Sequence, residues 1–392
     1  MSFYIKKIRF LLPVALVLAL SGCWDRKEVN DVGFVLGNAI DKRGKNYQAT
    51  IQIALPGQLG GAGSKGGGGG TSGGKSYLMQ SSEGQTIRDA NRRQQEANSR
   101  ELNFSHRRVV LIGEEMARAG VEPIMDVLGR IPQNRLSALV VITKGEGKKV
   151  LEAQVPAENF PAETIRELAV NSMNKPRTIK HAVNLMIGEG IDLSLPYLGL
   201  SKQDSKLIKL EGLAVFKDNK LAGFLKDELA TGALLAMGEA RQPEHTLDPP
   251  EGEGKLVTAI YQYTVDMKPV IETDDITMKI SVKGLGEVIE NDSNYDIDTE
   301  RNIKAVEKTL NSQVEGDIRK AIEKLQTKHR ADIIGFGRTI RDIEPAVWDR
   351  IGGNWNKRYP DVKVVVDANI SIEHVGSLLS PLGRKEGNMV ND

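Results

Sequence analysis

The pattern G-x-x-x-x-G-K-[ST], which is typical of phosphate-binding loops, is satisfied by four residues near the end of a glycine-rich tract: Gly69, Gly74, Lys75 and Ser76. Such a loop binds phosphate through backbone N–H groups only where a buried strand precedes it and a helix follows it. Here a polar, glycine-rich stretch precedes the pattern, and Tyr77 to Met79 predict a short strand after it. Because glycine loses the most entropy on ordering, we expect residues 57–75 to form a disordered surface loop, and we expect no nucleotide or other cofactor.

The residues that could act as metal ligands, nucleophiles or general bases are scattered along the chain. The five histidines show no H-E-x-x-H or similar spacing, and they are His106, His181, His245, His329 and His374. No G-x-S-x-G motif marks a hydrolase nucleophile, and the adjacent pair Asp274-Asp275 would point to opposite faces of a strand. His106, beside an expected buried strand, is interpreted as structural rather than catalytic. The sequence thus predicts neither enzyme activity nor a metal site.

The single cysteine of the chain, Cys23, ends the segment Leu20-Ser21-Gly22-Cys23, which resembles the lipobox of bacterial lipoproteins. The segment before it is typical of a signal peptide, with an apolar run from Phe10 to Leu20 and a positive start formed by Lys6, Lys7 and Arg9. This run is shorter than the roughly twenty residues that span a bilayer. We expect a diacylglycerol-modified Cys23 to become the mature N-terminus and to anchor the protein in membrane lipid. The alternative is an ordinary secretory signal followed by an incidental cysteine.

The charge of the chain indicates which partners to expect, and its length indicates how many domains to expect. Lysine and arginine number 53 against 52 aspartates and glutamates, which gives a formal net charge of +1 at pH 7. With this balance and no long run of like charges, we expect no nucleic-acid partner. A chain of 392 residues is long enough for roughly two to four domains.

Apolar patterns predict an α+β fold of three mixed α/β modules in series. A hairpin is expected from Val32 to Leu55, and the helical stretch Glu114–Arg130 lies between two expected buried strands, Arg108–Ile112 and Ala138–Thr143. This order suggests a crossover unit, although the sequence does not set its pairing. The predicted divisions are a signal peptide at 1–22, an N-terminal α/β domain at 23–200, a small central hairpin-helix domain at 206–241, a C-terminal α/β domain at 256–376, and a tail at 377–392.

The strongest helical pattern lies in the last module, where apolar residues recur every three or four positions at Ile303, Val306, Leu310, Val314, Ile318, Ile322 and Leu325. Packing of this stripe on its own sheet is the favoured interpretation, and docking of a partner is the alternative. Further along, Trp348 and Trp355 are the best candidates for an interface, because tryptophan is enriched at protein contacts. Burial of both in the core is nevertheless the favoured interpretation, since Gly352-Gly353 between them would let both side chains pack.

Several blocks resemble the C-subunit lipoproteins of spore germinant receptors, the Ger(x)C family. They occur in family order and are CWDRKEVNDVGFVLGNAID from Cys23, Arg100-Glu101-Leu102 with His106, VVLIGEEMARAGVEPIMDVLGR at 109–130, EGLAVF at 211–216, DIIGFG at 332–337, Trp348 and Trp355. The glycine-rich tract is interpreted as a variable insertion.

The resemblance implies a three-domain protein, lipid-anchored through Cys23 on the outer face of the spore inner membrane. There it would assemble with membrane-embedded A and B subunits to detect nutrients and trigger germination, without catalysis of its own. A solute-binding lipoprotein of a transporter is the alternative, because it would carry the same kind of signal and would bind a small molecule alone. An aromatic content of 5% and three modules rather than two lobes favour the receptor subunit.

Overall fold

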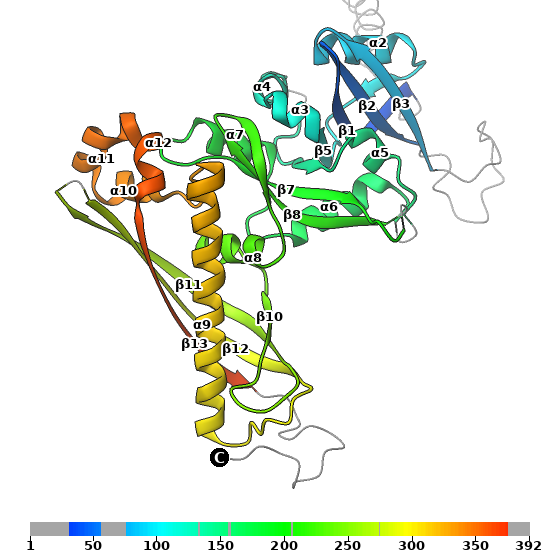
Figure 1. Ribbon diagram of the computed structural model, residues 1–392. Coiled ribbons are helices and arrows are strands. Elements are labelled where there is room, and N and C mark those ends of the chain that lie inside the picture. The colour runs from blue at the N-terminus through cyan, green and yellow to red at the C-terminus, as the bar shows by residue number, and fades with distance from the viewer. Residues whose placement is uncertain are drawn as a thin grey trace, which may run out of the picture.

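The computed structural model of the protein describes residues 31–55, 76–131, 134–155, 158–204, 207–273 and 275–374. Within these ranges the strands form two sheets, and each sheet with its helices is called a unit below. Figure 1 shows the N-terminal unit beside a C-terminal unit that is elongated along the helix α9. The chain therefore has the mixed α/β architecture that the sequence predicts. The predicted signal peptide, glycine-rich loop and tail lie outside the described residues.

The first sheet collects strands from the first 225 residues. They are β1 (Val32–Arg43), β2 (Asn46–Ala54), β3 (Tyr77–Gly84), β4 (Glu101–Asn103), β5 (Val109–Gly113), β6 (Leu139–Thr143), β7 (Ser194–Leu200), β8 (Ile208–Lys217) and β9 (Lys220–Leu225). Their spatial order is β3-β2-β1-β5-β6-β7-β8-β9, with β4 beside the start of β1. The four central strands are parallel, and antiparallel strands extend both ends. The expected hairpin and crossover unit are both confirmed.

Helices cover both faces of the parallel strands. They are α2 (Ile87–Glu96), α3 (Glu114–Ala119), α4 (Glu122–Arg130), α5 (Gly147–Leu151), α6 (Pro161–Asn171) and α7 (Ile179–Ile187). α3, α4 and α7 pack on one face and α5 and α6 on the other, which explains why β5 and β6 are apolar and buried throughout. The helix predicted over 114–130 is broken at Gly120, whose φ of +124° ends α3.

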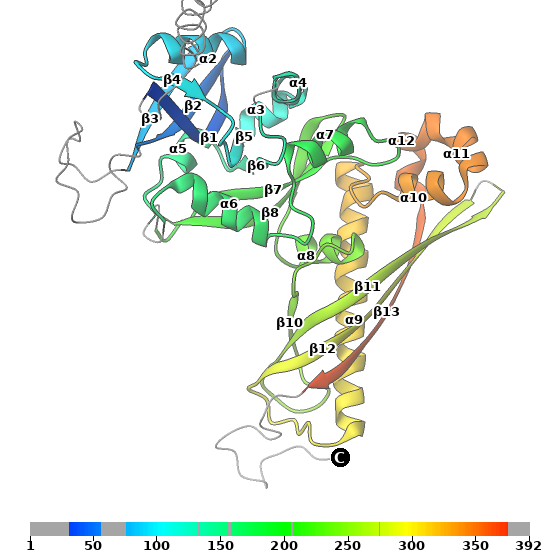
Figure 2. The same cartoon turned by 180° about the vertical axis from the view of Figure 1, so that it is seen from behind.

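The second sheet is a long ribbon with one helix along it. Its elements are α8 (Asp227–Ala236), β10 (Glu244–Leu247), β11 (Leu256–Glu272), β12 (Asp275–Asn291), α9 (Glu300–Lys324), the π-helical turn η3 (Leu325–His329), α10 (Phe336–Ile343), α11 (Pro345–Ile351), η4 (Gly352–Asn354), α12 (Trp355–Arg358), η5 (Tyr359–Asp361) and β13 (Lys363–His374). The strand order is β10-β11-β12-β13. Figure 2 shows α10, α11 and α12 gathered at one end of α9, next to α7 of the N-terminal unit.

The apolar stripe of α9 packs within its own unit, as the pattern favours. Val306, Leu310, Val314, Ile318 and Ile322 are at most 1% exposed and belong to one core with the inner face of the ribbon. Along the described part of the chain, no helix combines the length with the apolar character that a membrane span requires.

The segment 206–241 differs from the predicted separate central domain. β8 pairs with β7 in the N-terminal sheet, so the boundary predicted between 200 and 206 falls between two neighbouring antiparallel strands. α8 instead packs on α9, and a Cβ added at Gly232 would lie 2.3 Å from the carbonyl oxygen of Asp317. The hairpin and the helix are formed as expected. They do not make a domain of their own, because β8 pairs with β7 of the first sheet and α8 packs on α9.

Candidate functional site

Asp332 lies in the turn between η3 and α10, and it is the centre of a buried hydrogen-bond network with 1% of its surface exposed. Three backbone N–H groups donate to its carboxylate, from Gly335 at 2.8 Å, Phe336 at 3.0 Å and Gly337 at 2.9 Å. The indole Nε1 of Trp355 is a fourth donor at 3.0 Å. The left-handed φ of +88° at Gly335 brings the N-terminus of α10 back onto the carboxylate, where an anion is favoured.

Asp192, just before β7, connects this network to the N-terminal unit. The backbone N–H of Asp332 donates to Oδ2 of Asp192 at 2.7 Å, and the backbone N–H of Asp192 donates to the carbonyl of Asp332 at 2.8 Å. Lys217 at the end of β8 donates from Nζ to Asp192 at 3.0 Å and to Oδ1 of Asn356 at 2.6 Å. The two units are thus joined through one aspartate from each.

The carboxyl groups of this network have altered acidity. Burial raises the pKa of Asp332 to about 6, although the N–H donors of Gly337, Phe336 and Gly335 act in the opposite direction. Burial also raises the pKa of Asp192, where the charge of Lys217 opposes it. Four N–H donors contact the Asp332 carboxylate, an arrangement that suits its ionised form at neutral pH.

A close backbone approach lies beside the aspartates. The N–H of Arg338 donates to the carbonyl of Gly190 at 2.8 Å, and Nε1 of Trp348 donates to Oε2 of Glu189 at 3.2 Å. Gly190 has a φ of +70°, and a Cβ there would lie 2.4 Å from the backbone carbon of Gly337. Glycine is therefore the residue that this contact accommodates, because any side chain would push the two units apart.

A second connection between the N-terminal unit and the segment after α8 is ionic. Arg177 and Glu239 form an ion pair of 2.7 Å, with side chains 2% and 9% exposed. Beside it, the backbone N–H of Asn174 donates to the carbonyl of Glu239 at 2.8 Å, and its side-chain amide donates to the carbonyl of Ala240 at 2.9 Å. Contacts at two places hold the two units together.

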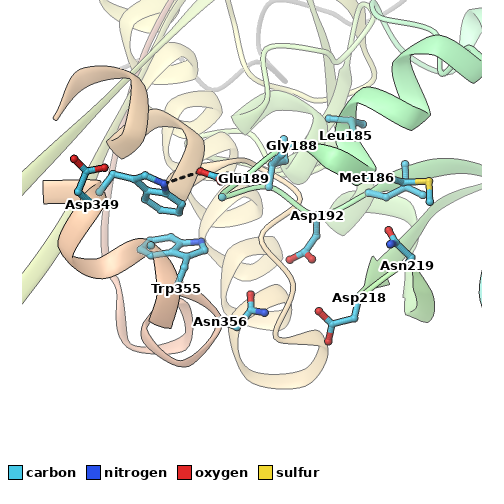
Figure 3. A pocket seen from close by; sticks show the side chains of 16 residues that line it. Leu185, Met186, Gly188, Glu189, Asp192, Asp218, Asn219, Asp349, Trp355 and Asn356 are labelled. Atoms are coloured by element: carbon cyan, nitrogen blue, oxygen red, sulfur yellow. Dashed lines mark hydrogen bonds between the residues drawn. The ribbon is translucent and has the colours of Figure 1, made fainter. Parts of the chain in front are cut away.

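A cavity of about 500 Å³ opens between the α7–β7 connection, the β8–β9 turn and the helices α11 and α12. Figure 3 shows Asp192 and Asp218 on the N-terminal side of it, and Trp355 with Asn356 on the C-terminal side. Glu189 and Asp349 also line it, so its charged groups are carboxylates. Such a lining suits a polar or cationic group. Among the described residues, no group of three or more histidines, cysteines, aspartates or glutamates is placed to hold a metal ion.

The structure describes only some of the residues that the sequence singled out. Cys23 and most of the G-x-x-x-x-G-K-[ST] pattern lie outside the described residues, so the prediction of lipidation stays a prediction. Ser76 is described, and the strand β3 follows it where a phosphate-binding loop would need a helix. The strand expected after the pattern is therefore confirmed.

Trp348 and Trp355 come together, with ring centroids 5.7 Å apart and exposures of 7% and 5%. Both indole N–H groups donate to carboxylates inside the chain, and both rings border the 500 Å³ cavity. Burial of the pair, the favoured interpretation, is confirmed. A role at an interface with another protein stays a prediction.

The histidines do not converge. His106 is exposed and meets Phe34 edge-to-face at 5.0 Å, while His374 stacks on Tyr261 at 6.3 Å. His245 is buried, with its Nδ1 3.6 Å from Oδ2 of Asp317. His181 lies in the first turn of α7, where its backbone N–H donates to the side chain of the capping Thr178.

Sequence reasoning missed Asp192, Lys217, Arg177 and Glu239. Each is a charged residue in a segment that looks like an ordinary loop or strand end, and its partner lies far away in the sequence. The DIIGFG block at 332–337 contributes to the family resemblance, and it also has a physical role. Its physical signal is an aspartate followed by two glycines, which is what a carboxylate needs when backbone N–H groups turn back onto it.

Comparison with known proteins matches both parts of the chain to spore germination families. The family described as "Spore germination protein N-terminal domain" matches residues 25–200, and that described as "Spore germination B3/ GerAC like, C-terminal" matches residues 211–376. The chain is 38% identical to the YfkR protein of Bacillus subtilis (strain 168) over 374 residues, which cover 94% of this chain and 96% of that one. It is 27% identical to spore germination protein KC of the same organism over 407 residues, covering 95% and 96%.

The fold is also found in a solved structure. The crystal structure of the GerBC protein superimposes with a TM-score of 0.58, at 19% identity, and covers 89% of this chain and all of that one. The first family match ends with β7 at residue 200 and the second begins inside β8 at residue 211, so the second matched region supplies most of the last two strands of the first sheet. With both matches in order over most of its length, the chain belongs to the Ger(x)C family of spore germination proteins.

Proposed function

We propose that the protein is the lipid-anchored C subunit of a nutrient germinant receptor, attached through an acylated Cys23 to the outer face of the spore inner membrane. It assembles there with the membrane-embedded A and B subunits and contributes binding surfaces rather than catalysis. The family supports a role in spore germination, and the anchor, the partners and the absence of catalysis are the parts that this proposal adds.

The observation that carries the proposal is the order of motifs along one chain. A signal-peptide pattern ends in Leu20-Ser21-Gly22-Cys23, and the first family match begins at residue 25, directly after it. Acylation at Cys23 would therefore leave almost the whole matched body exposed beyond the membrane surface. Two acyl chains give stable attachment without a membrane-spanning helix.

The geometry supports action by assembly. The Asp192–Asp332 contact and the Arg177–Glu239 ion pair hold the two units together with buried groups. Surfaces of both units are then presented in a fixed arrangement, which lowers the entropy that is lost when a partner binds.

The first experiment compares germination of spores that carry the wild-type gene, a deletion or Cys23→Ala, in a strain without related receptors. Responses to amino acids, sugars and nucleosides are measured, together with the amount of the protein in membrane and soluble fractions. We expect the deletion and Cys23→Ala to lose the response to the same subset of nutrients. Cys23→Ala should also move the protein out of the membrane fraction.

Assembly is tested by capture of the tagged wild-type chain from detergent-solubilised spore membranes. Multispanning A and B subunits should be recovered with it, and far less of them with Cys23→Ala at equal protein level. A deletion strain that responds normally to every nutrient would refute the receptor role. Normal germination with a soluble Cys23→Ala protein would refute only the dependence on the lipid anchor and would leave the receptor role standing.

A further inference from the structure

The chain between Cys23 and the described residues is short. Asp31, the first described residue, lies eight residues after Cys23 and leads directly into β1. Eight residues span at most about 28 Å, whatever their conformation. The inference rests on the proposed function at this point, because an acylated Cys23 places the start of β1 within that distance of the bilayer. The surface around the start of β1 is therefore the part of the described structure that the anchor holds closest to the membrane.

The start of β1 belongs to the edge of the N-terminal sheet at which the parallel strands begin. β4 pairs with β1 there, with Glu101 opposite Val32, so Arg100 lies beside the residue that precedes β1. Further along the same edge, the N–H of Leu139 at the start of β6 donates to the carbonyl of Arg108, directly before β5, at 2.9 Å. The edge that the anchor reaches therefore runs from β4 across β1 and β5 to β6.

The loop before β6 and the loop before α7 lie side by side on this edge. The N–H of Ile179 donates to the carbonyl of Ala138 at 2.8 Å, and the N–H of Lys180 donates to the carbonyl of Leu136 at 3.1 Å. Both loops turn their side chains to the solvent. The exposed ones include Arg135, Leu136, Lys175 and Lys180.

Cations prevail along this edge. Four of them form no ion pair with the residues that the structure describes, and they are called the basic edge below: Arg100, Arg135, Lys175 and Lys180. Nearby carboxylates already have cationic partners, since Asp126 pairs with Arg130 at 2.7 Å and Glu163 lies 3.9 Å from Arg108. Glu101 adds a negative charge beside Arg100, which leaves an excess of positive charge. The carboxylates of the 500 Å³ cavity lie beyond it, at the β7 and β8–β9 end of the sheet.

An apolar side chain is exposed among these cations. Leu136 follows Arg135 directly, and 43% of its surface is accessible to solvent. A single exposed apolar residue is ordinary on a protein surface. Next to unpaired cations and close to a lipid anchor, it has a specific use, because surfaces that lie in a membrane interface combine basic residues with apolar ones.

We propose that the basic edge binds the anionic phospholipid headgroups of the membrane in which Cys23 is anchored. Two acyl chains hold the protein on the bilayer but leave it free to turn about the short tether. Attraction between the basic edge and the headgroups removes this freedom, because each cation near an anionic surface is stabilised there. Figure 1 shows α9 running away from α2 and α4, with the start of α9 farthest from them. The C-terminal unit is thereby directed away from the bilayer in one orientation.

The test uses the acylated chain in nanodiscs, made either of phosphatidylglycerol mixed with phosphatidylcholine or of phosphatidylcholine alone. Because Cys23 is the single cysteine of the chain and its thiol is acylated, Ser137→Cys places one reactive thiol next to the basic edge. A fluorophore on this thiol is quenched by lipids that carry a nitroxide on the headgroup. Ser312→Cys, at an exposed position of α9, supplies the reference probe.

Two sets of substitutions are compared with the wild-type surface. The test variant removes three charges of the basic edge: Arg135→Gln/Lys175→Gln/Lys180→Gln. The matched control removes three exposed lysines at the opposite edge, where β1, β6 and β7 end: Lys45→Gln/Lys149→Gln/Lys202→Gln. Both sets lower the net charge equally, so a difference between them reports where the charges lie.

We expect the probe at Ser137→Cys to be quenched at least twofold more in nanodiscs with phosphatidylglycerol than in phosphatidylcholine alone. The excess should be lost in the test variant and at high salt, which screens the charges, and kept in the control. The reference probe should respond equally in all cases. Equal quenching in the two lipid compositions overturns the proposal, and so does an equal response of the test variant and its control. Failure of the anchor is seen separately, because the chain then elutes apart from nanodiscs of both compositions, and the anchor and this inference are then both wrong.

Discussion

Asn311 of α9 exchanges two hydrogen bonds with the backbone of Ile370 in β13. The N–H of Ile370 donates to Oδ1 of Asn311 at 2.8 Å, and Nδ2 of Asn311 donates to the carbonyl of Ile370 at 3.3 Å. Glu315 and Glu307, one turn on either side, accept from the N–H groups of Ala368 and Ile372. The helix therefore satisfies the edge of the last strand with side chains, as a neighbouring strand would with its backbone.

Asn311→Ala should reduce the free energy of unfolding by roughly 1–3 kcal/mol, because the buried N–H of Ile370 loses its acceptor. Urea unfolding of the purified protein measures the change. Ser312→Ala, on the exposed face of the same turn, is the control and should change stability little. Equal effects of the two substitutions would show that the helix does not satisfy this edge.

Local features of this fold could be predicted from the sequence because each is determined by a few neighbouring residues. The apolar stripe of α9 and the hairpin of β1 and β2 both appear where the pattern places them. The hairpin β8–β9 was also correct as a local unit. Its assignment to a separate domain failed because the strand that pairs with β8 precedes the predicted boundary.

The candidate site could not be predicted, since it depends on groups that meet only in the folded chain. Asp192 and Asp332 are 140 residues apart in sequence, and neither lies in a pattern that indicates the other. The sequence favours burial of the two tryptophans, but it does not show the hydrogen bonds to Glu189 and Asp332 that hold them facing inward.

Asp332→Asn should destabilise the protein on the order of 3 kcal/mol. The carboxylate accepts four N–H groups, and an amide would present its own N–H₂ to at least one of them. Asp349→Asn makes the same chemical change in the lining of the adjacent cavity, where the side chain is exposed, and should be nearly neutral. A similar stability for both variants would contradict the role assigned to the buried carboxylate.

The pH dependence of stability should carry a contribution from Asp332. Its pKa is about 6 in the folded protein against an ordinary value of 3.8, so the folded state binds this proton more tightly than the unfolded state. The contribution to the free energy of unfolding is therefore fully present below about pH 4 and is lost as the pH rises through about 6. A shift of about two pKa units corresponds to about 3 kcal/mol.

This contribution is measured as the difference between unfolding curves of wild type and Asp332→Asn from pH 4 to 8. The free energy of the wild type should fall more steeply between pH 4 and 6, because the amide does not titrate. Parallel curves over this range would mean that the carboxyl is not perturbed.

Gly190→Ala tests the contact between the two units. Gly190 and Gly145 have nearly the same φ, +70° and +69°, so alanine at either position meets a similar backbone penalty of roughly 1–2 kcal/mol. A Cβ at Gly145 meets nothing within 4 Å, whereas one at Gly190 would lie 2.4 Å from Gly337. Gly190→Ala should therefore cost clearly more stability than Gly145→Ala.

The same substitution should loosen the contact locally, because the N–H of Arg338 loses the carbonyl of Gly190 when the backbones move apart. Hydrogen exchange at Arg338 and at Asp332, whose N–H donates to Asp192, should accelerate in Gly190→Ala at least tenfold more than in Gly145→Ala. Exchange in the middle of α9, for example at Val314, should change only with global stability. If Arg338 and Asp332 exchange no faster than Val314 does, the two units are held by contacts other than the Asp192–Asp332 pair.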